Sequence, residues 1–305
     1  MTDPVANPWQ SPIAYDRGRF IAKFTEVFAK DARLNAGSVP AMLTLLGHIE
    51  RVRKIVDIRW AAYLLATTMW ETTSPQRVER PVLNKKGQSL RDKKGKPITV
   101  KHIRWIMTMA PVEEIGHSKG HRYHQPVKVK LLADGRVRIT EHDGDQFIVK
   151  ADGKFKAISK GAKPGAADAA PAAKVYDDDD GDEQVYFGRG YVQLTWWSNY
   201  ARAGALMGRG YALLLDPDKV KTPEIAYALM SYGMRTGEGF ANGNCFTDYF
   251  TDTSTDYVAA RAMVNGDNHA EDIAKIAKIA KKFQAVLLQS QGVGAAAALP
   301  GQRLP

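Results

Sequence analysis

The chain has 305 residues, 44% of them hydrophobic and 25% charged, which is enough apolar material for one large core or two small ones. Its single cysteine, Cys245, excludes an internal disulfide framework and any multi-cysteine zinc or iron–sulfur site. The net charge is +10, and the window from Arg80 to Lys130 alone holds 13 Lys or Arg against three carboxylates, which favours an anionic partner.

Neither a membrane span nor a secretory signal is evident in the sequence. No stretch approaches the roughly 20 apolar residues that a membrane-crossing helix requires. Residues 1–15 form a polar N-terminal extension without the basic-then-apolar layout of a signal peptide. We therefore expect synthesis in a bacterial or host cytoplasm, and action on a cell wall or in the periplasm only after release or injection.

Three amphipathic helices are predicted in the first part of the chain. Apolar residues recur at three- and four-residue spacing within 16–33, from about 38 to 52, and from about 57 to 70. The third helix is expected to end at Glu71-Thr72-Thr73, because Pro75 biases the residue before it away from helical geometry.

A basic segment and a β-rich insertion follow. Asn84-Lys-Lys-Gly87 and Asp92-Lys-Lys-Gly95 are turn signals, which predict the tips of a basic loop or hairpin. Over 126–158 the apolar period becomes two, and Asp-Gly pairs interrupt it every nine residues, which predicts a β-meander. A flexible linker rich in Gly, Ala, Pro and Lys is predicted over 160–173, and the whole insertion extends to residue 182.

Helical signals return in the last third of the chain. Helices are predicted over 200–207, 222–234, 255–264 and about 270–289, and a disordered tail over 291–305. The layout is a mainly α catalytic domain formed by 16–125 and 183–290, interrupted by a small β-rich insertion over 126–182.

Neither of two potential metal-binding segments has a complete ligand set. The acidic run 177–183 fails as a calcium loop, because Tyr176 and Phe187 occupy the positions where carboxylate ligands are needed. His117, His121 and His124 lack a clear fourth ligand for zinc. We therefore expect no metal and no cofactor.

Two segments carry side chains suited to chemistry. Glu71 is a carboxyl group at the end of an apolar helix, where it is either a simple exposed glutamate or a proton donor. The run from Tyr186 to Tyr200 combines Gln, Thr, Asn and aromatic residues, which supply the directional hydrogen bonds and flat apolar faces that bind a sugar. The same composition is also common in an edge strand beside a turn.

Three segments, taken in order along the chain, resemble glycoside hydrolase family 19, which comprises chitinases and related phage and bacterial endolysins. They are Glu71-Thr-Thr, the run Gly188-Arg-Gly-Tyr-Val-Gln-Leu-Thr195 with Asn199-Tyr200, and Val264-Asn265-Gly266. The resemblance covers about 40–125 and 184–285. It implies a lysozyme-like, two-lobed helical fold and inverting hydrolysis of β-1,4-linked N-acetylglucosamine polymers.

The resemblance also implies roles for individual residues. Glu71 would be the general acid, and Glu114 the base that activates water, with Glu113 and then Glu79 as alternatives. Thr195 would help to hold the water. The remaining residues expected to bind sugar are Gln193, Asn199, Asn265, Tyr191 and Trp196. Trp70 departs from the family, which often has His before the catalytic glutamate.

Three functions follow as hypotheses. The first is a monomeric enzyme that cleaves β-1,4 links of peptidoglycan, as an endolysin or an injected lytic effector, with the basic insertion against an anionic wall. The second is a chitinase with the same machinery. The third is a non-catalytic wall-binding or virion structural protein. No nucleic-acid partner is expected, since no recognition motif accompanies the basic segment.

Overall fold

The computed structural model describes residues 9–11, 14–31, 33–118, 120–158, 181–264 and 270–291. The α-helices in this part of the chain are α1 Arg17–Phe28, α2 Ser38–Val52, α3 Ile58–Glu71, α4 Trp197–Leu206, α5 Ala212–Leu215, α6 Pro223–Thr236, α7 Phe246–Tyr249 and α8 Ala270–Gln289. Short 3-10 helices are η1 Ile115–Ser118, η2 Arg122–His124, η4 Pro217–Lys221, η5 Gly239–Ala241 and η6 Ala259–Met263. None of the described helices is long and apolar enough to cross a membrane.

The strands in the described residues form three separate sheets. The two long strands β1 Thr73–Pro81 and β2 Thr99–Met107 pair with each other, and so do the short strands β3 Val112–Glu113 and β9 Arg189–Gly190. The third sheet is antiparallel in the order β7-β6-β5-β4-β8 and consists of β4 Val127–Leu131, β5 Val137–Thr140, β6 Gln146–Val149, β7 Phe155–Ala157 and β8 Asp182–Gln184.

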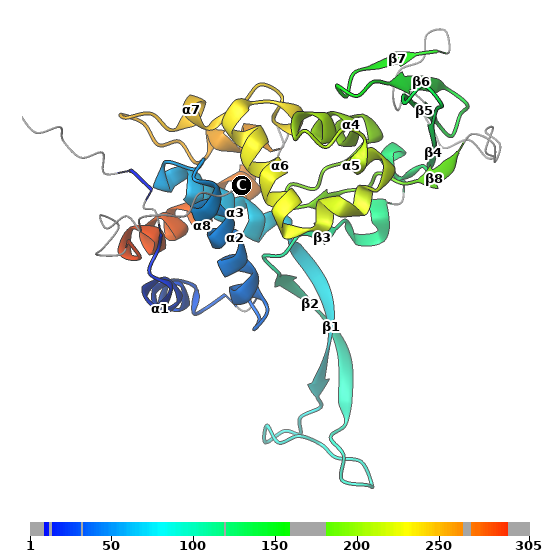
Figure 1. Ribbon diagram of the computed structural model, residues 1–305. Helices are drawn as coiled ribbons and strands as arrows, with labels where there is room; N and C mark the ends of the chain where they lie inside the picture. The colour runs from blue at the N-terminus through cyan, green and yellow to red at the C-terminus, as the bar shows by residue number, and fades with distance from the viewer. Residues whose placement is uncertain are drawn as a thin grey trace, which may run out of the picture.

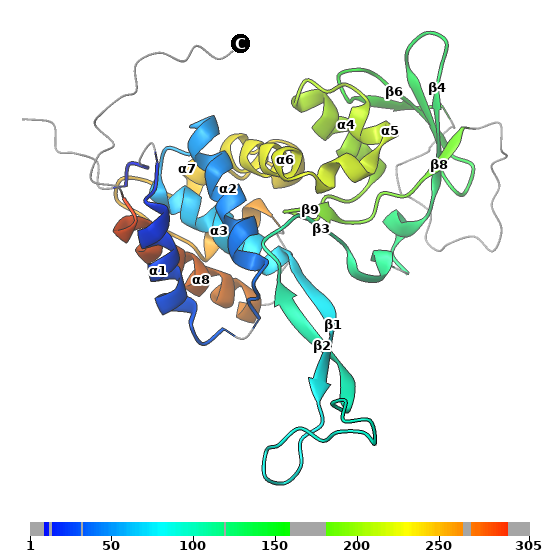
Figure 2. The same cartoon turned by 60° about the horizontal axis from the view of Figure 1, so that its bottom comes forward.

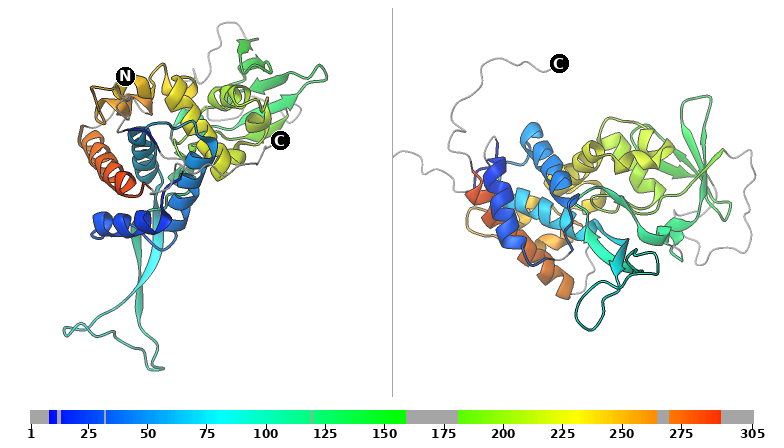
Figure 3. Two further views of the ribbon diagram at one scale, coloured as in Figure 1. Left: turned by 60° about the vertical axis from the view of Figure 1, so that its left-hand side comes forward. Right: turned by 90° about the horizontal axis from the view of Figure 1, so that it is seen from below.

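A helical body surrounds α3, whose side chains from Ile58 to Met69 are almost all buried. Asp57 begins this helix, because its carboxylate accepts a hydrogen bond from the backbone of Arg59. On α1, Phe24 and Phe28 lie against Phe283 of α8, with ring centroids 6.0 Å and 5.0 Å apart. Figures 1 and 3 place α1 and α8 at one end of the molecule and the five-stranded sheet at the other.

The five-stranded sheet packs against α4. Buried residues alternate along β6, as the two-residue period predicts, and the ring centroid of Phe147 of β6 lies 5.2 Å from that of Trp197 at the start of α4. Trp197 Nε1 donates a 2.6 Å hydrogen bond to the buried carboxylate of Glu141. This contact joins residues 56 positions apart and fixes the sheet to the helix that follows the Gly188–Thr195 run.

Strands β1 and β2 form an arm. They pair in antiparallel register from Thr73 opposite Met107 to Pro81 opposite Thr99. Figures 1 and 2 show the arm projecting away from the helices and ending in two loops. At its base the hydroxyl of Thr72 accepts a hydrogen bond from the backbone of Met109 and donates one to Thr68 O, so the arm is tied to the end of α3.

The predicted mainly α, two-lobed fold with a small β-rich insertion is wrong. Residues 73–81 and 99–107, which were assigned to the helical part, are the long strands of the arm. The run Thr99–Met107 contains β-branched and aromatic residues, which favour extended backbone. The five-stranded sheet is also larger than a local meander, because β8 joins it from beyond the linker. The chain therefore combines helices with substantial antiparallel sheet.

One predicted helix is also wrong. Residues 255–264 were expected to be α-helical, but the structure has a short 3-10 helix, η6, over Ala259–Met263. The turn before it is held by Asp256, whose carboxylate accepts hydrogen bonds from the backbone N–H groups of Val258 and Ala259. A side chain that caps its own backbone in this way competes with continuation of a helix.

Candidate active site

Glu71 is the last residue of α3. The apolar helix holds its backbone in the core, while 16% of its side chain remains exposed. Arg261 of η6, 190 residues further along the chain, donates from Nη1 to Glu71 Oε1 at 2.5 Å. The Arg261 side chain is 7% exposed, so this is a largely desolvated ion pair that fixes the orientation of the carboxyl group.

Glu114 follows β3 and lies directly against Gly188. The backbone N–H of Glu114 donates to Gly188 O at 2.7 Å, and Gly188 N–H donates back to Glu114 Oε2 at 3.0 Å. The hydroxyl of Tyr123 donates to Oε1 at 3.3 Å. Both carboxylate oxygens therefore have donors, and the group is held in one orientation.

Glycine at 188 is required by this close approach. A Cβ at this position would lie 2.9 Å from Gln193 Oε1 and 3.0 Å from Glu114 Oε2. Gly190 is restricted in another way, because its φ is +87° and a Cβ would lie 2.9 Å from Val220 Cγ1. The two glycines of the Gly-Arg-Gly run thus allow the backbone to pass between the second carboxylate and η4.

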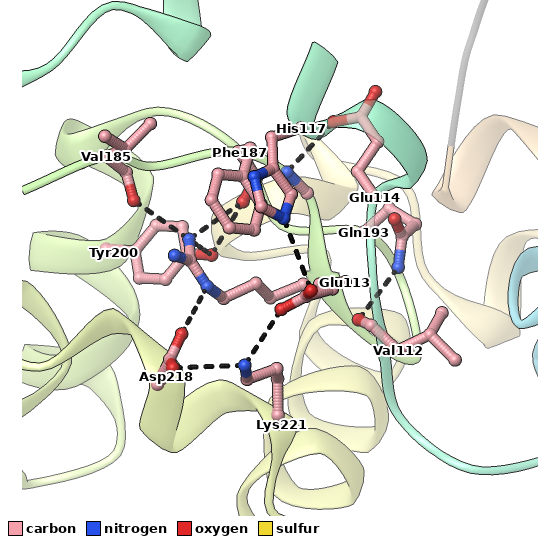
Figure 4. A network of polar contacts seen from close by, with 12 residues as sticks. Val112, Glu113, Glu114, His117, Val185, Phe187, Gln193, Tyr200, Asp218 and Lys221 are labelled. Atoms are coloured by element: carbon pink, nitrogen blue, oxygen red, sulfur yellow. Dashed lines mark hydrogen bonds and ion pairs between the residues drawn. The ribbon is translucent and has the colours of Figure 1, made fainter.

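Arg189, between these glycines, is a buried anchor. Its guanidinium donates to Asp218 Oδ1 at 2.9 Å and to the carbonyl oxygens of Val185 and Phe187, and it lies 3.6 Å from the centroid of the Phe187 ring. On the other face of the motif, His117 stacks on Phe187 with a centroid separation of 4.1 Å. Figure 4 shows this network joining the Glu113–Glu114 segment to η4.

Glu113 and Glu79, the alternative candidates for the base, point to other partners. Glu113 accepts from Lys221 Nζ at 2.9 Å and lies 3.3 Å from the ring of His117, and these contacts hold the pKa of its carboxyl below the usual value. Glu79 lies on the exposed arm, where it accepts a hydrogen bond from Thr99. Of the three carboxylates, Glu114 is the one that lines the same cavity as Glu71.

That cavity has a volume of about 450 Å³ and brings together segments far apart in the sequence. Five residues predicted for the site line it: Glu71, Glu114, Gln193, Thr195 and Asn199. Its lining also includes aromatic rings and further amide and apolar groups, from Tyr123, Val192, Leu194, Phe240, Asn242 and Val264. Two carboxyl groups, three amides, a hydroxyl and two aromatic rings therefore surround one open space.

Three of the predicted sugar-binding residues are not among those that line the cavity. Tyr191 is 1% exposed and belongs to the core. Trp196 lines a smaller neighbouring cavity with Tyr123, whose ring it contacts edge-on. Asn265 lies outside the described residues, although Val264 beside it lines the cavity.

The sequence reasoning missed Arg261, Tyr123, Phe240 and Asn242. None of the four lies in the motifs that carried the resemblance. Asn242 lies in an Ala-Asn-Gly turn with φ of 49°, a composition that predicts a turn and not a site. Arg261 precedes the Val264-Asn265-Gly266 motif by three residues, and its partner could be identified only from the folded chain.

The histidines at 117, 121 and 124 do not converge. The ring of His117 stacks on Phe187, and that of His121 stacks on Tyr123 at 5.2 Å. Within the described ranges, no group of three His, Cys, Asp or Glu residues is arranged to hold a metal ion.

Comparison with known proteins gives few matches. No protein-family model matches the chain, and no curated protein matches it. Among solved structures it is similar to chitinase C from Streptomyces griseus HUT6037, with 16% identity, 90% of this chain and 79% of that chain covered, and a TM-score of 0.38.

Proposed function

We propose that the cavity is the active site of a glycoside hydrolase that cleaves β-1,4 links of cell-wall peptidoglycan with inversion of configuration. The observation that carries the proposal is the meeting of Glu71 and Glu114 in one open cavity with Thr195, Gln193 and Asn199. Two carboxyl groups on opposite sides of a sugar can act as general acid and general base.

In this reaction Glu71 donates a proton to the glycosidic oxygen as the bond to the anomeric carbon breaks. Glu114 takes a proton from a water molecule, whose oxygen forms the new bond on the opposite face of the ring. Arg261 contacts Glu71 Oε1, so Oε2 is the oxygen available to carry the proton, and the guanidinium stabilises the carboxylate left after transfer.

The groups around the carboxylates have complementary tasks. The hydroxyl of Thr195 orients the attacking water, while the amides of Gln193 and Asn199 bind sugar substituents. Asn199 Nδ2 donates to Thr195 O at 2.9 Å, and Gln193 Nε2 donates to Val112 O and Gly190 O, so both side chains are oriented before a sugar arrives. Tyr123 and Phe240 offer the aromatic faces on which sugar rings pack.

Charge supports peptidoglycan over chitin as the substrate. Peptidoglycan carries carboxylates on its muramic acid and peptide groups, whereas chitin is a neutral polymer. A protein of net charge +10 is attracted to the first and gains nothing electrostatically from the second.

The test is digestion of purified sacculi by the wild type and by Glu71→Gln, Glu114→Gln and Glu79→Gln. We expect the first two substitutions to lower hydrolysis by at least about 100-fold and the third to leave it unchanged, since Glu79 lies on the arm. The activity of Glu113→Gln on sacculi distinguishes the two neighbouring carboxylates. If Glu113→Gln loses hydrolysis while Glu114→Gln keeps it, the general base is Glu113.

Analysis of the fragments identifies the bond and its stereochemistry. Mass spectrometry reports whether the new reducing end is muramic acid or glucosamine, and NMR of the first product reports an α-anomer if the β-link is inverted. Release from colloidal chitin but not from sacculi would make the protein a chitinase. If the wild-type protein pellets with sacculi but releases no product, the enzymatic proposal is overturned.

A further inference from the structure

The arm formed by β1 and β2 takes no part in the proposed reaction. Among the described side chains of its two strands, those of Ile106 and Met107 at the base are buried, whereas no side chain from 81 to 99 is buried. A two-stranded ribbon of this kind has little core of its own and is marginal in water unless something else contacts it. Figure 2 shows that no other described segment covers its far half.

The end of the arm contains two similar turns that begin eight residues apart. Their sequences are Asn84-Lys-Lys-Gly-Gln and Asp92-Lys-Lys-Gly-Lys, and in each turn the glycine has φ near +78°. In both, the first side chain accepts hydrogen bonds from the backbone two and four residues on, at 2.8–3.0 Å. Each turn therefore presents a pair of lysines on a preformed loop.

Three backbone hydrogen bonds join the two loops at a common point. The N–H of Val82 donates to Ile98 O, that of Leu90 to Val82 O, and that of Ile98 to Leu90 O, with lengths of 2.7–2.8 Å. The loops are thus held together as a two-pronged tip, which is visible at the lower end of the arm in Figure 1.

The arm carries most of the charge of the protein. From Thr73 to Met107 there are ten Lys or Arg against Glu79 and Asp92, a net charge of +8 in a chain of net +10. Across this segment no Lys or Arg forms an ion pair with a carboxylate of the described residues. Its cations are therefore available to an external anion.

Large apolar side chains lie exposed among these cations. At the tip, Leu83, Leu90 and Ile98 are 54%, 40% and 41% exposed. Along the shaft, Val100, Ile103 and Trp105 are each more than half exposed. A hydrophilic polyanion would neutralise the lysines and leave these side chains in water, whereas a lipid surface offers anionic phosphates and, just beneath them, an apolar layer.

We propose that the tip of the arm docks on the surface of a bilayer containing anionic phospholipids. Lys85, Lys86, Lys93 and Lys94 contact the phosphate groups, and the apolar side chains at the junction of the two loops enter the boundary between headgroups and acyl chains. The docking holds the protein at the membrane without crossing it, and it does not depend on hydrolysis in the cavity.

The experiment is flotation of the full chain with vesicles of phosphatidylglycerol and phosphatidylcholine, compared with phosphatidylcholine alone. The test variant carries Lys85→Gln, Lys86→Gln, Lys93→Gln and Lys94→Gln. The matched control loses four exposed lysines of the body, through Lys30→Gln, Lys54→Gln, Lys278→Gln and Lys281→Gln. A variant with Leu83→Ser, Leu90→Ser and Ile98→Ser tests the apolar contribution, and circular dichroism checks that each variant is folded.

We expect the wild type and the body control to bind the anionic vesicles. The affinity of the tip-lysine variant for these vesicles should be lower by a factor of at least about 100. The serine variant should also lose vesicle binding. The loss should be present at high salt as well, because the electrostatic attraction is then screened and the missing apolar contacts account for the difference. Equal loss in the tip-lysine and control variants would contradict the proposal, because net charge alone would then be responsible. Binding of wild type to soluble polyphosphate but not to vesicles would instead identify a polyanion-binding arm.

Discussion

Gln193 and Trp196 have backbone φ values of 51° and 70°, a region that residues with side chains rarely adopt. Such a conformation costs on the order of 1–3 kcal/mol and persists only where surrounding contacts impose it. Here the Gln193 amide is bonded to two carbonyl oxygens, and the Trp196 N–H donates to Tyr186 O at 3.0 Å. The two strained residues flank Thr195 in the chain, and Thr195 lines the cavity.

Gly188 provides the sharpest prediction at the level of one residue. In Gly188→Ala the new methyl group would meet Gln193 Oε1 and Glu114 Oε2, so we expect a loss of about 1–3 kcal/mol in the free energy of unfolding and a fall in hydrolysis. Urea unfolding and release of sugar from sacculi measure the two effects. Gly47→Ala is the control, because its methyl group has no neighbour nearer than 3.9 Å. Unchanged stability and activity in Gly188→Ala would mean that the close approach is not needed.

Glu113 predicts a dependence of stability on pH. Its carboxyl pKa is lowered, first by the hydrogen bond from Lys221 and then by that with His117, so the network contributes stability above the ordinary value of 4.5 and loses it as the pH falls through the lowered pKa. The side chain is 46% exposed, so the contribution is at most about 1 kcal/mol.

Urea unfolding of the wild type and of Glu113→Gln should therefore differ at pH 7 and differ less at pH 3. Glu79→Gln serves as the control, because its carboxylate accepts a hydrogen bond from a threonine and should show little difference at either pH. A deficit in Glu113→Gln that is the same size at both pH values would show that the ion pair is not its source.

At the level of secondary structure, the main junction is between the five-stranded sheet and α4. The Asp-Gly spacing located the turns of the meander, since this pair favours the left-handed backbone of a tight hairpin turn. It contained no information on β8, whose pairing places Gln184 opposite Val127 from across the linker. The site depends on this junction because α4 carries Asn199 and begins at Trp197, two residues after Thr195.

Two tryptophans allow this junction to be tested. Trp197→Phe removes the donor to the buried Glu141 carboxylate, and a hydrogen bond to a charged group is worth about 1.5–3 kcal/mol. Trp60→Phe removes a similar ring whose buried Nε1 has no partner among the described residues, so it controls for lost volume. We expect Trp197→Phe to lower the free energy of unfolding by more than Trp60→Phe. Equal losses would indicate that packing alone fixes the sheet.

At the scale of the molecule, the charge is concentrated in one projection. The arm has a net charge of +8, which leaves the rest of the chain close to neutral. Attraction to an anionic surface therefore acts at one end of the molecule and should weaken steeply as salt rises. An arm that begins two residues after Glu71 would also set the position of the cavity relative to whatever the tip contacts.

The body should fold and act without the far half of the arm. Replacing residues 81–99 by Asn-Gly closes the strands with a two-residue hairpin turn. Because no side chain in that range is buried, we expect the free energy of unfolding to change by less than about 0.5 kcal/mol, with hydrolysis of soluble wall fragments retained and vesicle binding lost. Thermal unfolding measures the stability, product release measures the hydrolysis, and flotation measures the vesicle binding. A truncated protein that fails to fold would show that the arm supports the body.

What the sequence alone determined was local. Apolar spacing located the principal helices, because helical periodicity is set by residues three and four apart. Pro75 located the end of α3 near Glu71, because a proline biases the residue before it away from helical geometry. Turn chemistry located the tips of the arm and the meander. The motif residues Gln193, Thr195 and Asn199 were identified by resemblance. All three line one cavity together with Glu71.

What only the tertiary structure decided depends on contacts between distant segments. The pairing of Arg261 with Glu71, the position of Glu114 and not Glu113 in the cavity, and the burial of Tyr191 each depend on which surfaces pack together. The extent of sheet was underestimated for the same reason. A strand is stabilised by a partner that can lie far along the chain, so its pattern alone does not reveal how large the sheet becomes.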